Sequence, residues 1–134
     1  MRKLKLAGLV FVFCWFFFGG IGHFVQTDFF VSIVPPYIAW PRAAVYVSGV
    51  CELLGAFALI PLATRRLAGW ALLLLIVCVT PANLYMWLHP ELFPKFSPAL
   101  LSARMVAQVL LMVCVWWSTR PDRVRVQTGV PAGL

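Results

Sequence analysis

The sequence predicts an all-α polytopic membrane protein, an antiparallel bundle of four transmembrane helices. Of its 134 residues, 63% are hydrophobic and only 11% are charged, which leaves too little polar surface for a water-soluble domain of this length. The apolar residues form four runs, each close to the roughly 20 residues that cross a bilayer core as a helix. The basic residues flank these runs and do not follow one surface, which argues against a nucleic-acid-binding protein.

We expect a single membrane domain over residues 1–134, because no loop or tail is long enough to fold alone. The first run follows the basic start MRKLK, but its bulky FCWFFF segment lacks the small-residue cleavage site of a signal peptide. The second and third runs are joined by PLATRRL, which indicates a tight antiparallel hairpin. The predicted spans are about 6–25, 43–62, 67–88 and 99–118, and residues 119–134 form a short tail.

The basic residues also predict the orientation of the chain. Eight of the eleven lie with the two termini and the PLATRRL turn, and the other three are Arg42, Lys95 and Arg104. Because positive loops stay in the cytoplasm, we expect both termini there and a location in the bacterial cytoplasmic (inner) membrane.

The segment QTDFFVSIVPPYIAWPR, between the first two predicted spans, is too short and too proline-rich to cross a bilayer. It is nevertheless apolar and aromatic. Two interpretations stay open: an anchor at the membrane interface, or a lid that folds over a ligand cavity.

Polar residues occur in all four predicted spans, toward the outer side of the membrane. With a rise of about 1.5 Å per residue, Glu52 and Gln108 both lie roughly 13 Å below the outer ends of their helices. A charged side chain at the bilayer centre costs about 2.5–3.5 kcal/mol, so such groups are expected to face the bundle interior. We therefore predict a polar pocket that opens outward. Its candidate residues are His23, Ser48, Glu52, Asn83, Arg104 and Gln108.

Arg104 is the predicted partner of Glu52, in an ion pair that forms the pocket floor, with Asn83 and Gln108 satisfying the remaining donors and acceptors. Two alternatives remain open. The pair fixes helix register and binds nothing, or Glu52 is kept protonated by desolvation.

No other pattern predicts a reaction. The chain has no CxxC pair, so its four cysteines are interpreted as packing residues. His23 and His89 lack a third ligand, and no metal site is predicted. Phosphate-binding and hydrolase motifs are also missing from the sequence. The cysteines are Cys14, Cys51, Cys78 and Cys114.

Several segments resemble, in the same order, the DoxX-like family of small four-helix integral membrane proteins. They are GIGHF, IVPPYIAWPRAAVYVSGVCELLGAF, TRRLAGWALLLL and TPANLYM, within residues 19–87. The resemblance implies a compact four-helix domain, associated in some members with quinone-linked oxidation of sulfur compounds and in others with thiol-stress systems beside partner enzymes. The positions that match the family's pattern are His23, Glu52, Arg65, Pro81 and Asn83.

Two functions therefore stay open. The first is a component of a membrane redox system that binds a quinone or another apolar small molecule, with Glu52 and His23 exchanging protons while Arg104 and Asn83 hold a carbonyl oxygen. The second is a non-catalytic accessory or scaffold protein for membrane or soluble redox partner enzymes. Neither the oligomeric state nor the presence of catalysis follows from the sequence.

Overall fold

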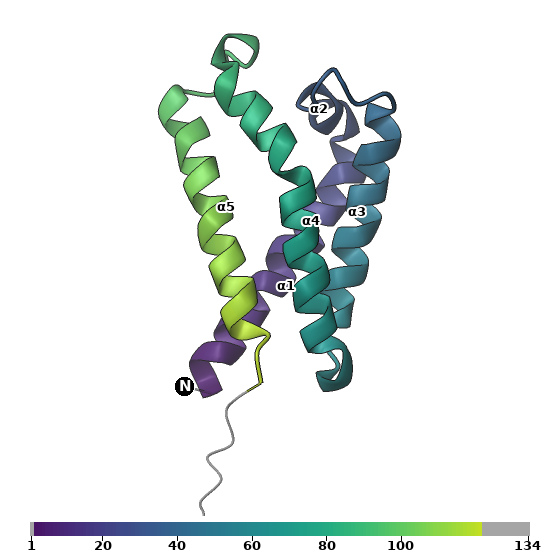
Figure 1. The fold of residues 1–134 in the computed structure, drawn as a ribbon, viewed down its shortest axis with the longest axis vertical. Helices are drawn as coiled ribbons and strands as arrows, with labels where there is room; N and C mark the ends of the chain where they lie inside the picture. The colour runs from purple at the N-terminus through teal and green to yellow at the C-terminus, as the bar shows by residue number, and fades with distance from the viewer. Residues whose placement is uncertain (1, 122–134) are drawn as a thin grey trace, which may run out of the picture.

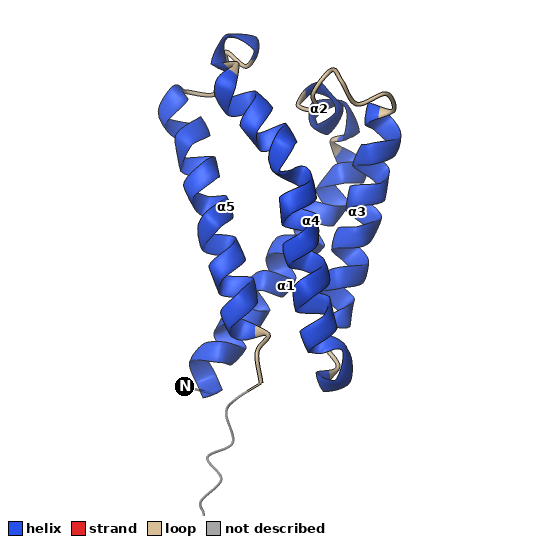
Figure 2. Cartoon of the chain, in the orientation of Figure 1, coloured by secondary structure: helices blue, strands red, loops and turns tan. Residues whose placement is uncertain are grey.

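The computed structural model describes residues 2–121, and over these residues all regular secondary structure is helical, joined by loops (Figure 2). The predicted all-α fold class is confirmed. Most of the predicted tail, 119–134, lies outside the described residues. The elements are α1 (Arg2–Val25), α2 (Thr27–Ser32), α3 (Pro41–Ala58), α4 (Leu62–Leu88), the 3₁₀ helix η1 (Pro90–Leu92) and α5 (Pro98–Ser118).

Three of these helices, α1, α4 and α5, are long and apolar enough to cross a membrane. These three helices indicate a multi-pass membrane protein. Helix α3 has 18 residues and is not among the three. Its hydropathy is reduced by Arg42, Ser48 and Glu52, so a fourth span stays a prediction.

The junction between α3 and α4 is shorter than predicted. Helix α3 ends at Ala58 and α4 begins at Leu62, so most of PLATRRL belongs to α4 and does not form a turn. Pro61 stands just before the helix, where proline is tolerated because no backbone donor is needed there. Arg65 donates to the carbonyls of Leu59 (2.9 Å) and Ile60 (3.0 Å), which are left unpaired as α3 ends.

The four long helices run alternately up and down in Figure 1, and the closely packed pairs are α1 with α3, α3 with α4, α4 with α5, and α5 with α1. We call the end that holds the N-terminus and the α3–α4 junction the inner end, and the end that holds α2 and η1 the outer end. Lys5 donates from Nζ to the carbonyl of Arg120 at 3.1 Å, which ties the first turns of α1 to the residues after α5.

Two apolar clusters hold the helices together. The larger fills the inner half, and the smaller joins the segment after α2 to the outer ends of α4 and α5. The inner cluster contains Val12, Phe16, Ala56, Leu59, Ala68, Leu72, Ile76, Leu111 and Val115. The outer cluster contains Ile33, Met86, Phe93 and Leu101.

Helices α1 and α3 approach closely because glycines face each other. A Cβ atom added at Gly49 would lie 2.8 Å from the Cβ of His23 and 3.2 Å from the carbonyl oxygen of Gly20. Small residues allow such close backbone contact in membrane helices, where packing is the main source of helix association.

Replacing Gly49 with alanine should therefore destabilise the protein by about 1–3 kcal/mol, because the obstructing His23 Cβ is attached to the α1 backbone and cannot rotate away. The measurement is the thermal unfolding midpoint in detergent. Gly22→Ala is the matched control, since its Cβ would lie 3.6 Å from Phe30, an ordinary contact. Equal midpoints for the two variants would contradict the close α1–α3 contact.

Candidate functional site

A cavity of about 730 Å³ lies between the α1–α3 pair and the α4–α5 pair, toward the outer end. Its volume falls within the roughly 300–1,000 Å³ of known ligand pockets. Most of its lining is apolar, and Phe16, Ile76 and Leu111 of the inner cluster close it toward the inner end. All six residues predicted for the pocket line this one cavity: His23, Ser48, Glu52, Asn83, Arg104 and Gln108.

Helix α2 and the segment that follows it cover the cavity from the outer end. Phe30, Ile33 and Pro35 line the cavity, and Ile33 is only 4% exposed. Tyr37 and Trp40, in contrast, are 74% and 79% exposed. The residues that line the cavity are thus placed as a lid requires. The exposed Tyr37 and Trp40 are placed as an interfacial anchor requires.

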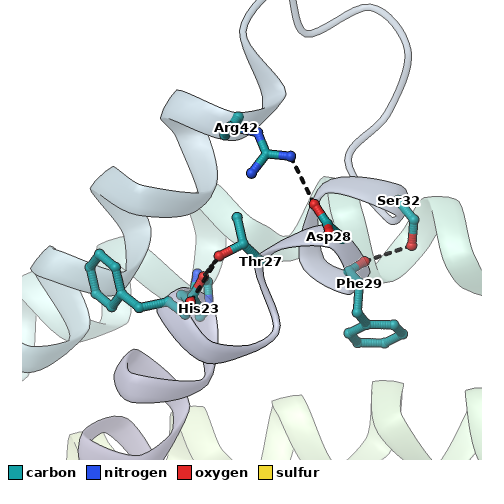
Figure 3. A network of polar contacts seen from close by, with 7 residues as sticks. His23, Thr27, Asp28, Phe29, Ser32 and Arg42 are labelled. Atoms are coloured by element: carbon teal, nitrogen blue, oxygen red, sulfur yellow. Dashed lines mark hydrogen bonds and ion pairs between the residues drawn. The ribbon is translucent and has the colours of Figure 1, made fainter.

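Polar contacts fix α2 against α1 and α3 (Figure 3). Thr27 is buried and donates from Oγ1 to the carbonyl of His23 at 2.9 Å. Asp28 of α2 accepts a hydrogen bond from Arg42 of α3 at 2.8 Å, in an exposed ion pair. The first contact is shielded from solvent, so it holds the start of α2 more firmly than the second does.

His23 and Glu52 form the polar part of the α1–α3 wall. The imidazole Nδ1 lies 2.9 Å from the carbonyl of Val45, and because a carbonyl can only accept, Nδ1 carries the proton. The other nitrogen, Nε2, lies 3.5 Å from Oε1 of Glu52. The ring of His23 stacks on Phe30 of α2 with centroids 4.1 Å apart. Both residues line the cavity, so the imidazole Nε2 and the carboxylate face it side by side.

The predicted ion pair between Glu52 and Arg104 is not formed among the described residues. Glu52 instead lies beside His23, with Oε1 3.5 Å from Nε2, and Arg104 donates to Oδ1 of Asn83 at 3.0 Å. The reason is the order of the helices: α3 packs on α1 and α4, whereas α5 packs on α4 and α1. Glu52 and Arg104 therefore belong to different walls of the cavity.

The α4–α5 wall has a hydrogen-bonded chain of its own. Asn83 donates from Nδ2 to Oε1 of Gln108 at 2.5 Å, and Gln108 donates from Nε2 to Oγ1 of Thr80 at 2.6 Å. Thr80 in turn donates to the carbonyl of Ile76 at 2.8 Å. Thr80 was not among the predicted residues, although its position three residues before Asn83 places it on the same helix face.

The cavity also reaches the outside of the bundle along α1. Phe11, Trp15 and Phe18 line it and are 50%, 48% and 66% exposed. These residues belong to a helix that can span a membrane, so this side of the cavity adjoins the lipid. A ligand can therefore combine a polar group between the two walls with an apolar part that extends along α1.

The family model for a domain of unknown function, DUF8561, matches residues 12–119. The chain belongs to the DUF8561 family. The match includes every cavity-lining residue named above except Phe11. Searches of curated proteins and of solved structures found no match. The resemblance of this DUF8561 protein to the DoxX-like family stays a prediction.

Double-mutant cycles distinguish the observed pairing from the predicted one. Because His23 and Glu52 are in contact, Glu52→Gln and His23→Gln should show a coupling energy of about 0.5–3 kcal/mol. The effects of Glu52→Gln and Arg104→Gln should add to within about 0.5 kcal/mol, since within residues 2–121 Glu52 contacts His23 and Arg104 bonds to Asn83. The measurement is the free energy of unfolding in detergent. Coupling between Glu52 and Arg104, with additive effects for Glu52 and His23, would support the predicted Glu52–Arg104 ion pair instead.

Proposed function

We propose that this DUF8561 protein is a DoxX-like component of a membrane redox system and binds a quinone, or a similar apolar small molecule, in the cavity. The observation that carries this proposal is the position of polar groups on two facing walls of a cavity that is otherwise apolar and adjoins lipid. A few convergent polar groups within an apolar lining are typical of small-molecule sites.

The chemistry of a quinone matches the two walls. Its carbonyl oxygens need hydrogen-bond donors. The Arg104 guanidinium has five N–H groups, and within the described residues one of them donates to Asn83. Phe30, stacked on His23, offers a flat surface for the ring. Phe11, Trp15 and Phe18 provide an apolar path for the tail. His23 and Glu52 are placed to exchange protons when the ligand is reduced or oxidised, and the electrons come from a partner redox protein.

Loss of the carboxylate should weaken ligand binding and leave the fold intact. For Glu52→Gln we expect at least a tenfold rise in the Kd for the reduced, quinol form of a short-chain ubiquinone, whose hydroxyl group can donate a hydrogen bond to the carboxylate. An interaction worth about 1.4 kcal/mol changes affinity tenfold. The measurement is quinol titration of the purified protein in detergent, together with extraction and chromatography of any quinone that copurifies. Cys51→Ser is the control, because Cys51 is the exposed neighbour of Glu52 on α3 and does not line the cavity.

A second pair of variants tests the cavity without changing charge. Ala107 of α5 lines the cavity, whereas Ala103, one turn earlier, is exposed and does not. Ala107→Trp should exclude the ligand and Ala103→Trp should not. If both bind quinone as the wild type does, the ligand lies elsewhere and the proposal fails.

We further propose that α3 is the fourth span of an antiparallel four-helix transmembrane bundle in the bacterial inner membrane, with both termini cytoplasmic. Three spans would place the termini on opposite sides of a membrane, whereas four place them on the same side. The hydrogen bond between Lys5 and the Arg120 carbonyl supports the second arrangement, because it joins the two ends of the helical region. The excess of basic residues at this end favours the cytoplasm.

Fusion proteins test this topology directly. A green fluorescent protein attached to either terminus should fluoresce in bacterial cells, and alkaline phosphatase attached to either terminus should be inactive, because both termini lie in the cytoplasm. A phosphatase inserted after Tyr37, in the exposed part of the outer segment, should be active. Opposite results for the two termini would exclude the fourth span.

The exposed Tyr37 and Trp40 favour a second function, that of a non-catalytic accessory or scaffold protein for partner enzymes. Large aromatic side chains are enriched where proteins contact each other. Under this function the outer segment would contact a partner and the cavity would hold only lipid. Absence of quinone binding in the wild-type protein would favour it.

A further inference from the structure

A second, smaller cavity of about 360 Å³ lies at the inner end, between the start of α4 and the end of α5. We propose that it binds the phosphate headgroup of an anionic phospholipid. The proposal does not depend on the ligand of the larger cavity, because the two cavities share no lining residue.

The charge around this groove is positive. Arg66 of α4 and Arg120, just after α5, both line it, and no acidic residue of the described range 2–121 does. Of the four acidic residues in the chain, Asp28 and Glu91 lie near the outer end and Glu52 lines the larger cavity. The fourth, Asp122, is outside the described residues. Guanidinium groups match a phosphate well, because two parallel N–H donors can bind two of its oxygens.

The walls of the groove are aromatic. Trp70 of α4 and Trp116 of α5 line it, and both are partly exposed, at 55% and 41%. The guanidinium of Arg120 lies over the ring of Trp116, with its carbon 3.5 Å from the ring centroid. This contact orients the charge at the edge of the groove. Tryptophan is enriched at the level of lipid headgroups, and basic pockets between spanning helices are typical sites for anionic headgroups.

The floor of the groove is formed by a close contact between the two helices. Gly69 is buried, and a Cβ atom added to it would collide with the Oγ1 of Thr119. Thr119 is itself buried, and its hydroxyl donates to the carbonyl of Val115 at 2.8 Å. The hydroxyl is thus already engaged, and the recognition of an anion falls to the two arginines at the edge.

Native mass spectrometry of the full chain tests this site, with dioleoyl phosphatidylglycerol and dioleoyl phosphatidylcholine added in equal amounts to detergent micelles. The wild type should retain one phosphatidylglycerol in preference to phosphatidylcholine. R66Q/R120Q should raise the apparent Kd for phosphatidylglycerol about 30-fold, since each basic residue near an anionic lipid contributes roughly a factor of five. The affinity for phosphatidylcholine should not change.

The control R2Q/K3Q removes two exposed charges from the start of α1 at the same end, outside the groove, and should keep the preference. An equal loss in this control would show unspecific attraction and overturn the proposal. Equal retention of the two lipids by the wild type, or an unchanged R66Q/R120Q, would also overturn it. Displacement of the lipid by excess inorganic phosphate would show a site for free phosphate, against the lipid headgroup proposed here.

If R66Q/R120Q does not fold, as judged by helix content and gel filtration, the single variant R66Q replaces it. Arg66 is exposed, and its loss leaves the contact between Arg120 and Trp116 in place. We expect about a fivefold loss of phosphatidylglycerol affinity for R66Q. No loss in this variant would overturn the proposal.

Discussion

Polar side chains between membrane helices must find partners within the protein, because lipid offers none. Here each helix pair satisfies its own groups. His23 and Glu52 contact each other within the α1–α3 pair, while Asn83, Arg104 and Gln108 bond within the α4–α5 pair. In the part of the chain that the structure describes, no buried side-chain nitrogen or oxygen lacks a partner. Because the demand is met on each side, no hydrogen bond or ion pair between residues of 2–121 joins the two walls across the cavity.

The two pairs are joined by apolar packing at their ends, together with the Lys5–Arg120 hydrogen bond at the inner end. The inner cluster, with Leu72 and Ile76 of α4 and Phe16 of α1, closes one end of the cavity. The outer cluster joins Ile33, from the segment after α2, to Met86 and Leu101. Close helix contact adds to the inner end, where Leu72 packs directly against Gly55. The cavity is therefore closed by packed apolar residues at both ends, has polar groups on two facing walls and adjoins lipid along α1.

This division explains which parts of the site the sequence could predict. The depth of a residue follows from the fixed rise of a helix, so placing Glu52 and Gln108 at one level required only the ends of the spans. The partner of Glu52 depends on which helices are neighbours, and hydropathy carries no information on that order. The informative signal was Gly49, whose close contact with α1 brings His23 near Glu52. The α3–α4 junction was misplaced for a local reason: leucine, alanine and arginine are strong helix formers, and Pro61 can precede a helix as well as end one.

The lipid surroundings also determine what the cavity can recognise. An apolar ligand that leaves the bilayer for this cavity gains little from the hydrophobic effect, because acyl chains are as apolar as Phe11 or Leu111. An acyl chain can also enter along the exposed side of α1 and compete for the same space. Selection of a ligand over lipid must then come from hydrogen bonds and charge, which an acyl chain cannot supply. The cavity offers these at two places, the imidazole and carboxylate of one wall and the guanidinium and amides of the other. A molecule with two polar groups, spaced to reach both walls, is favoured over one with a single polar end.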